Sequence, residues 1–203
     1  MTAALLPSHI GCVYLHGFLS SPASTKAQQL IQYFNDHGMA NQLAVPTLAF
    51  APDTAIKQAQ DAVVALQHTE GITKVFVIGS SLGGYYATYL SQALGIKAVL
   101  INPAVAPYAL LDKYLGPNQH FYDGQTYVLE MNHIEQLRHL EVDQILRPSD
   151  VFLLLQTADE TLDYSLACCK YSQSPSWIEA GGNHSFVDFM QRLPMVFHFV
   201  CSD

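Results

Sequence analysis

The chain is poor in basic residues. It carries 9 Lys and Arg against 17 Asp and Glu, which gives a formal net charge of −8. No basic run is present that could follow a phosphate backbone, so we do not expect a nucleic-acid partner. Charged residues of both signs make up only 13% of the chain and hydrophobic residues 50%, a composition typical of a globular protein rather than a disordered one.

Long apolar runs are missing as well. None approaches the roughly 20 residues that a membrane span requires, and residues 1–9 lack the basic start and the long apolar core of a signal peptide. The four cysteines form neither a Cys-x-x-Cys pair nor a disulfide framework, so we interpret them as buried free thiols in a reducing cytoplasm. The length of 203 residues suits a single domain over 1–203 with a full three-layer core.

The stretch around Ser81 carries the strongest chemical signal. Apolar, mostly β-branched residues at 75–78 predict a buried strand, and apolar positions at steps of three and four after Ser81 predict a helix. Between them Gly79 and Gly83 flank Ser81 at the ±2 positions, where side chains would collide in a tight turn. Strand, Gly-x-Ser-x-Gly and helix together are typical of the nucleophile elbow of an α/β-hydrolase. Ser81 is therefore the candidate nucleophile, whereas Ser80 lacks the flanking glycines.

Strand and helix alternate along most of the chain at intervals of 25–35 residues. This rhythm predicts right-handed crossovers and an α/β-hydrolase fold, with three α/β/α layers and about six mostly parallel strands. The expected strands are 10–15, 41–45, 75–78, 97–101, 151–155 and 175–179; the expected helices are 23–37, one from a cap at Asp53-Thr54 to about 71, 82–94, 163–171, 186–192 and one after Pro194.

Residues 102–150 interrupt the alternation. They hold several prolines, glycines and aromatic residues and one expected helix at about 132–140. An insertion of this size between two strands is expected to cover the carboxyl edge of the sheet, where ligands bind in open α/β sheets. Two interpretations stay open: a small lid or cap, or connecting segments without a gating role.

A serine nucleophile needs a histidine base and a carboxylate that orients it, in the chain order Ser, acid, His. Of the nine histidines, only His184 follows the last expected strand in a glycine-rich turn. Three acids lie after the strand before it. Asp159 follows that strand most directly, Glu160 is the next choice, and Asp163 is explained by N-capping of a helix.

The oxyanion hole requires two backbone N–H groups. One is expected from Leu82, the residue after the nucleophile, and the other from Phe18 in the loop after the first strand. His16 and Gly17 begin that loop directly after an apolar strand, which favours a functional loop over a plain turn.

Five motifs extend beyond the generic hydrolase pattern. They are His16-Gly-Phe-Leu-Ser-Ser-Pro22, Gly79-Ser-Ser-Leu-Gly-Gly84, Asn102-Pro103, Asp159-Glu-Thr-Leu-Asp-Tyr164 and Gly181-Gly-Asn-His-Ser-Phe186. From about residue 11 to residue 199 the chain resembles the YqiA-type esterases, which are small bacterial α/β-hydrolases. The resemblance implies a serine esterase for short-chain acyl esters, or for acyl-CoA thioesters, with Ser81, Asp159 and His184 as its triad.

These observations predict a carboxylic-ester hydrolase that needs neither a metal nor an organic cofactor, with a small acyl ester or thioester as its substrate. The nearest alternative is an acyl-CoA thioesterase with the same triad, although few Lys or Arg lie near the motifs to hold a nucleotide phosphate. A non-catalytic binding module of hydrolase fold is a second alternative. A His/Cys metal protein is the third, but Cys168-Cys169 with distant histidines lacks the usual zinc spacing.

Overall fold

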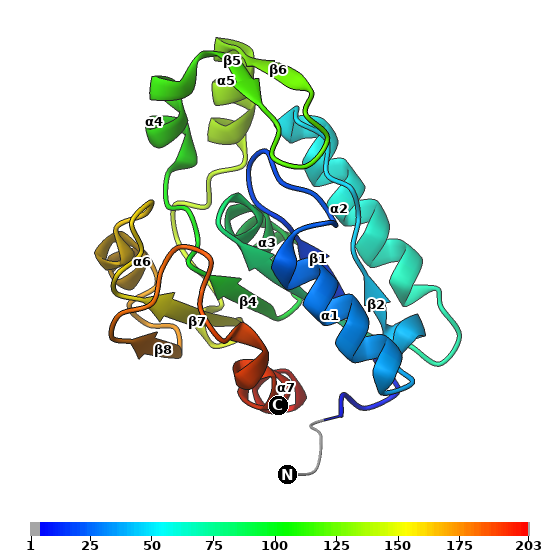
Figure 1. The fold of residues 1–203 in the computed structure, drawn as a ribbon. Helices are drawn as coiled ribbons and strands as arrows, with labels where there is room; N and C mark the ends of the chain where they lie inside the picture. Colours follow the sequence, from blue (N-terminus) through cyan, green and yellow to red (C-terminus); the bar gives the residue numbers. More distant parts are fainter. Residues whose placement is uncertain (1–4, 203) are drawn as a thin grey trace.

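A six-stranded parallel sheet forms the centre of the computed structural model, which describes residues 5–202 (Figure 1). Residues 1–4 lie outside the described residues. They belong to the segment 1–9, which the sequence analysis expects not to be a signal peptide. The strand order is β2-β1-β3-β4-β7-β8, and every pair is parallel. The strands are β1 (Ile10–Leu15), β2 (Leu43–Ala44), β3 (Lys74–Ser80), β4 (Ala98–Ile101), β7 (Val151–Gln156) and β8 (Ser176–Glu179). The expected α/β-hydrolase fold is confirmed.

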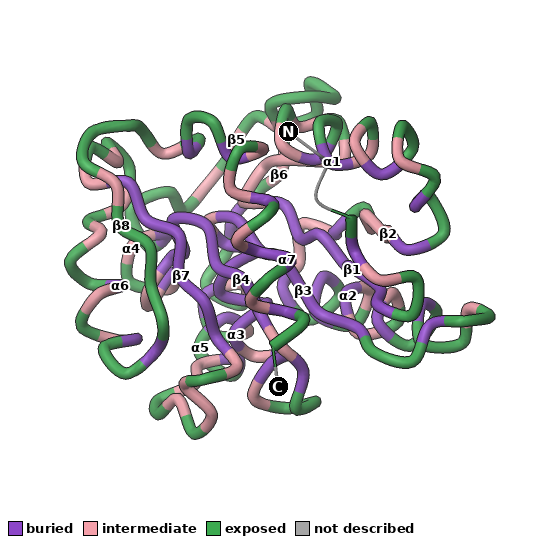
Figure 2. Tube along the Cα trace, turned by 90° about the horizontal axis from the view of Figure 1, so that it is seen from below, coloured by how far each residue is buried: buried purple, intermediate pink, exposed green. Residues whose placement is uncertain are grey.

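Side chains of the central strands alternate between two hydrophobic clusters, one on each face of the sheet. On β3, for example, Val75 and Val77 enter one cluster and Phe76 and Ile78 the other, as the two-residue period of a strand requires. Figure 2 shows β1, β3, β4 and β7 as the buried centre of the molecule. Because both faces are covered, these strands read as continuous apolar runs in the sequence.

Helices pack on both faces of the sheet. One cluster takes the buried side chains of α1 (Thr25–Asp36), the 3₁₀ helix η4 (Phe189–Arg192) and α7 (Leu193–Cys201). The other takes those of α2 (Pro52–Gln67), α3 (Leu82–Leu94), α5 (Met131–His139) and α6 (Tyr164–Lys170). Within residues 5–202 no helix combines the length and the apolar character that a membrane crossing demands.

Three local predictions differ from the structure. The strand expected at 41–45 is reduced to two residues, because the chain forms a 3₁₀ helix, Ala40–Gln42, before it. Asp53 does not cap α2; the N-cap is Ala51, Pro52 begins the helix, and Asp53 lies in the first turn, where a carboxylate favours the helix dipole. The helix expected at 186–192 is a short 3₁₀ turn from Phe189, since Phe186 and Asp188 have positive φ angles.

The segment 102–150 adds a hairpin that its pattern did not predict. Strands β5 (Gly116–Gln119) and β6 (Thr126–Leu129) pair antiparallel between α4 (Pro107–Leu111) and α5, and these elements lie together at the top of Figure 1. Helix α5 is part of the core: Ile134 and Leu137 are buried, and the Tyr85 hydroxyl donates to the Leu137 carbonyl. Helix α5 therefore anchors the segment to the helix layer that contains α3.

Candidate active site

Ser81 occupies the turn between β3 and α3. Its backbone has φ 57° and ψ −120°, a conformation that residues other than glycine seldom adopt. Two hydrogen bonds hold it: the Ser81 N–H donates to the carbonyl of Ile101, and the N–H of Ala104 donates to the carbonyl of Ser81, each at 3.0 Å. The neighbouring strand and the start of segment 102–150 thus fix the strained turn.

Three glycines make this turn sterically feasible. A Cβ on Gly79 would overlap the backbone carbonyl of Gly83, and a Cβ on Gly83 would overlap the carbonyl of Leu15 on β1. A Cβ on Gly84 would lie 2.7 Å from the Cβ of Pro103. Gly79 and Gly83, singled out from the sequence, are therefore required by close backbone approach, and the same requirement extends to Gly84.

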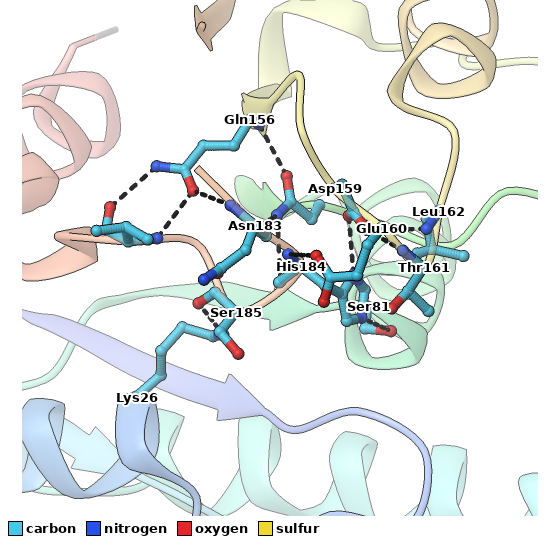
Figure 3. A network of polar contacts seen from close by, with 12 residues as sticks. Lys26, Ser81, Gln156, Asp159, Glu160, Thr161, Leu162, Asn183, His184 and Ser185 are labelled. Carbon is cyan, nitrogen blue, oxygen red and sulfur yellow. Dashed lines mark hydrogen bonds and ion pairs between the residues drawn. The ribbon is translucent and has the colours of Figure 1, made fainter. Parts of the chain in front are cut away.

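The structure brings Ser81, His184 and Asp159 together in one chain of hydrogen bonds (Figure 3). The distance from His184 Nε2 to Ser81 Oγ is 3.1 Å, and that from His184 Nδ1 to Asp159 Oδ2 is 2.8 Å. Because an ionised carboxylate only accepts hydrogen bonds, Nδ1 carries the imidazole proton and Nε2 is left to accept the hydroxyl proton of Ser81.

Asp159 is held as an anion. Its side chain is only 2% exposed, and burial acts to raise its pKa. Hydrogen bonds from His184 and from the backbone N–H groups of Leu162 and Thr161 outweigh that effect and hold the pKa below its ordinary value. The carboxylate therefore keeps its charge and orientation in the neutral pH range.

The other two acids considered from the sequence occupy different places. Glu160 is exposed, and its Oε2 accepts the backbone N–H of His184 at 2.9 Å rather than the imidazole. Asp163 is the N-cap of α6, where its side chain accepts the N–H of Ser165. Asp159 is thus the carboxylate in contact with the ring of His184.

The loop that carries His184 is fixed by Gln156, at the end of β7. The Gln156 side-chain oxygen accepts the backbone N–H groups of Asn183 and Val187, and its amide nitrogen donates to the Val187 carbonyl and to Glu179. Since Gln156 is 3% exposed, these bonds are shielded from water. Sequence analysis missed this residue; the signal was a polar side chain at the end of a buried strand.

Asn102, at the end of β4, holds the same loop from the other side. Its side-chain nitrogen donates to the carbonyls of Asn183 and His184, and its side-chain oxygen accepts the N–H of Gln156. Asn102 is 2% exposed and has a φ of 40°, a left-handed conformation that asparagine tolerates better than most residues. Asn102 and Gln156 together set the position of His184.

The two expected oxyanion donors lie beside Ser81. Leu82 is the first residue of α3, so its backbone N–H has no acceptor within the helix. Phe18 follows Gly17, whose backbone passes so close to the nucleophile turn that a Cβ there would lie 3.2 Å from the Cβ of Ser81. Both residues line the same cavity as Ser81.

His16 stabilises the loop that contains Phe18. It is 3% exposed; its Nε2 accepts the N–H of Leu48, and its Nδ1–H donates to the carbonyl of Gly17, each at 3.1 Å. Burial lowers the pKa of His16, and the bond to Gly17 offsets this only in part. His16 is therefore a neutral structural imidazole that holds the loop against the chain near Leu48.

A cavity of about 1080 Å³ opens onto Ser81 and His184. Its walls come from the loop after β1 that contains Phe18 (the oxyanion loop, residues 16–20), the start of α1, the loop after β8 and segment 102–150. Two lysines, Lys26 on α1 and Lys113 after α4, lie in this lining; sequence analysis did not place either one at the site. Segment 102–150 thus forms a wall of the cavity, as its expected position over the sheet edge implies.

The cysteines and potential metal ligands lie apart from this arrangement. All four cysteines are free, but only Cys12 is buried; Cys169 and Cys201 are exposed because they lie on an outer helix face and at the end of α7. The expectation of four buried thiols was wrong for these positions. Within residues 5–202 no group of three or more His, Cys, Asp or Glu side chains is arranged to hold a metal ion.

The sequence model of the uncharacterised protein family UPF0227 matches residues 11–201 of the chain. Three solved structures share its fold. Est1E from Butyrivibrio proteoclasticus, solved with ferulic acid bound, is 13% identical to this chain, with a TM-score of 0.71. The match covers 94% of this chain and 88% of the Est1E chain. Alpha/beta hydrolase domain-containing protein 10 from mouse is 15% identical, with a TM-score of 0.68 and coverages of 97% and 90%. An esterase of Pyrococcus furiosus is 15% identical, with a TM-score of 0.63 and coverages of 96% and 82%.

Proposed function

The chain belongs to the UPF0227 family, and from this premise we propose that it is a serine carboxylic-ester hydrolase acting on short-chain acyl esters through an acyl-enzyme. The family match confirms the resemblance noted in the sequence. One observation carries the proposal above all: the continuous hydrogen-bonded chain from Ser81 Oγ through the His184 ring to Asp159. The preference for short acyl groups rests on the family resemblance.

In the proposed acylation step, Ser81 Oγ attacks the acyl carbonyl while its proton passes to His184 Nε2. The 3.1 Å separation of these atoms is within hydrogen-bond reach, so little movement is required. Asp159 accepts the Nδ1–H of His184 throughout and stabilises the imidazolium that forms. Its depressed pKa supports this role, because the carboxylate stays ionised at neutral pH.

The negative charge that develops on the carbonyl oxygen requires donors that are in place beforehand. We assign the backbone N–H groups of Leu82 and Phe18 to this role. The position of Leu82 at the N-terminus of the 13-residue helix α3 adds the positive end of the helix dipole. Collapse of the tetrahedral intermediate expels the alcohol, which takes the proton from His184.

Deacylation repeats the same steps with water. His184 removes a proton from the water molecule, the hydroxide attacks the acyl carbon, and Ser81 leaves with the proton returned by His184. The proton of Ser81 thus leaves with the alcohol, and water supplies the proton that restores Ser81, with His184 carrying each one. The segment 102–150 serves as a cap that lines the acyl cavity, since residues of α4 and of the hairpin region contribute to its wall.

The same steps would cleave a thioester, with a thiol in place of the alcohol. One observation favours this second candidate: Lys26 and Lys113 both line the cavity, and lysine is a common ligand of phosphate groups. Parallel assays with an acyl-CoA and with the aryl ester of the same acid compare the two candidates directly.

The proposal is tested by hydrolysis of a series of 4-nitrophenyl esters from acetate to laurate. We expect kcat/KM to be highest for acyl chains of a few carbons and Ser81→Ala to lower it at least about 10³-fold. Ser80→Ala is the matched control, because Ser80 lies next to the nucleophile but at the buried end of β3; it should retain most of the activity. Equal losses in both variants would contradict the assignment of the nucleophile.

A further inference from the structure

Lys26 places a cation beside the loop that carries His184. Four of the other Lys and Arg side chains among residues 5–202 form ion pairs with carboxylates, namely Lys57, Lys170, Arg147 and Arg192. Lys26 is half-buried, and its ammonium group donates a hydrogen bond to the uncharged carbonyl of Ser185, at 2.6 Å. Figure 3 shows its side chain extending from α1 to the loop that carries His184.

The position of Lys26 is unfavourable for a cation in two further ways. It lies in the first turn of α1, which contains no acidic residue, and the positive end of a helix dipole repels a cation. Burial lowers the pKa of Lys26 to about 8, although the negative charge of Asp159 acts to raise it. At neutral pH the group is still predominantly protonated, but it is poorly solvated.

The surroundings of Lys26 face the substrate cavity. Ser24, Thr25, Lys26 and Gln29, all from the start of α1, line the same cavity as Ser81 and His184. The Lys, Arg, Asp and Glu side chains in that lining are Lys26, Lys113 and Asp188, which are two cations and one anion. The lining therefore has a small excess of positive charge, whereas the whole chain carries a net charge of −8.

We propose that Lys26 and the N-terminus of α1 form a subsite for an anionic group of the substrate, so that the natural ester carries a carboxylate or a phosphate within reach of α1. An anion there would pair with the half-buried ammonium group and with the free N–H groups of the first helical turn. This inference rests on the proposed esterase function and narrows its substrate class. Lys113, which is exposed, adds longer-range attraction at the rim.

The test compares charged and neutral substrates of matched size. The acyl-side pair is mono-4-nitrophenyl adipate and 4-nitrophenyl hexanoate, which differ by a terminal carboxylate. The alcohol-side pair is a hexanoyl ester of glycerol phosphate and monohexanoyl glycerol, followed by acid release. We expect the wild type to prefer the anionic member of one pair, and that pair identifies whether the acyl group or the alcohol carries the charge.

Three variants assign the preference to Lys26. Lys26→Met should lower kcat/KM for the preferred anionic ester about tenfold or more, as loss of a charge-assisted hydrogen bond implies, mainly through KM, and should leave the neutral esters within about twofold. Lys26→Arg should retain the preference. Lys57→Met, a control on the exposed surface of α2, should change neither. An anionic-to-neutral ratio that is the same in the wild type and in Lys26→Met would overturn the inference.

A binding measurement keeps this inference separate from the hydrolytic activity. Calorimetry on Ser81→Ala uses two ligand pairs: monomethyl adipate with methyl hexanoate, and hexanoyl glycerol phosphate with monohexanoyl glycerol. In one pair the anionic member should bind about tenfold more tightly than the neutral member, and the double variant with Lys26→Met should lose the difference. Equal affinities within both pairs in Ser81→Ala would overturn the subsite while leaving the esterase proposal intact. Absence of hydrolysis by the wild type, with the affinity difference present, would contradict the esterase proposal alone.

Discussion

The side chain of Gln156 holds the loop of His184 by its backbone on both sides of the imidazole. It accepts the N–H of Asn183, the residue before His184, at 3.1 Å, and the N–H of Val187, three residues after it, at 2.8 Å. The histidine of the site thus depends for its position on an amide at the end of β7, three residues before Asp159. Strand β7 therefore positions both partners of the Asp159–His184 pair.

This relationship predicts a large difference between two adjacent glycines. Both have positive φ angles, 81° at Gly181 and 77° at Gly182, but a Cβ on Gly182 would overlap the side chain of Gln156, whereas nothing lies within 4 Å of one on Gly181. Gly181→Ala should lower the free energy of unfolding by about 1 kcal/mol, because alanine disfavours a positive φ angle. Gly182→Ala must also displace Gln156 and with it the loop of His184.

We therefore expect Gly182→Ala to reduce kcat about tenfold or more, since a shift of about 1 Å in a catalytic group can cost a hundredfold. Gly181→Ala should keep kcat within about twofold while lowering the melting temperature by a few degrees. Steady-state kinetics and thermal unfolding of both variants provide the comparison. Equal kcat values in the two variants would show that displacement of Gln156 does not displace His184.

A second prediction separates Asp159 from Glu160. Asp159→Asn should lower kcat by about 10³- to 10⁴-fold, because an amide facing Nδ1 favours the wrong tautomer of His184. Glu160→Gln should cost less than about tenfold, since an amide oxygen still accepts the backbone N–H of His184. The pH dependence of kcat/KM for both variants is the measurement. A larger loss in Glu160→Gln would reverse the assignment of the acid.

A third prediction concerns stability in acid. The pKa of Glu179 is lowered from 4.5 to about 2, mainly by the hydrogen bond from Arg192. Hydrogen bonds from Gln156 and Trp177 lower it further, whereas desolvation acts to raise it. A carboxylate with a depressed pKa in the folded state stabilises the fold above its unfolded pKa, and this contribution is lost as the pH falls towards the folded pKa. The relevant window is therefore pH 4.5 to 2.

Glu179→Gln should lower the melting temperature at pH 7 by about 2–6 °C, and its difference from the wild type should shrink as the pH falls through that window. Glu70→Gln, an exposed position, is the control and should show no such convergence. Thermal unfolding by circular dichroism at several pH values measures the effect. A constant difference from pH 7 to pH 2 would contradict the role of the ionised Glu179.

A fourth prediction addresses the hairpin in segment 102–150. His120 Nε2–H donates to the carbonyl of Ser20 at 2.9 Å, and the N–H of Phe121 donates to the carbonyl of Leu19 at 3.1 Å. The hairpin region is thereby tied to the loop that contains Phe18. His120→Leu should lower kcat by about threefold to tenfold with little change in KM, because the oxyanion donor becomes less well placed.

The exposed His139 at the end of α5 provides a matched control, and His139→Leu should leave kcat unchanged. Both variants are assayed with the same neutral ester under steady-state conditions. If His120→Leu raised KM and left kcat intact, the hairpin would act on substrate binding rather than on the oxyanion loop.

The central strands β1, β3, β4 and β7 were predictable because they are buried on both faces. Continuous apolar runs such as Val151–Leu155 and the glycine pattern around Ser81 signal their structure within a few residues. The hairpin Gly116–Leu129 was not predictable from its pattern, since Pro117 and a half-exposed second strand give no clear alternation. Strand β2 was overestimated because a local 3₁₀ turn competes with it.

For the site, the glycine pattern, the chain order and the positions after the expected strands led to the choice of Ser81, Asp159 and His184. The structure places these three in contact, while their chemical roles stay predictions. The supporting residues were harder to find. Asn102 and Gln156 hold the loop of His184 and each other through contacts 27 to 82 positions apart in sequence, which no local pattern encodes. Lys26 follows His16 by ten residues, and only the fold shows that the start of α1 turns towards the cavity.

The central claim is that Ser81 is an activated nucleophile, and intact-protein mass spectrometry after treatment with a fluorophosphonate probe tests it most directly. We expect a single adduct that maps to the peptide containing Ser81, absent in Ser81→Ala and strongly slowed in His184→Ala. A folded wild-type protein that forms no adduct, or an adduct that persists in Ser81→Ala, would contradict the account.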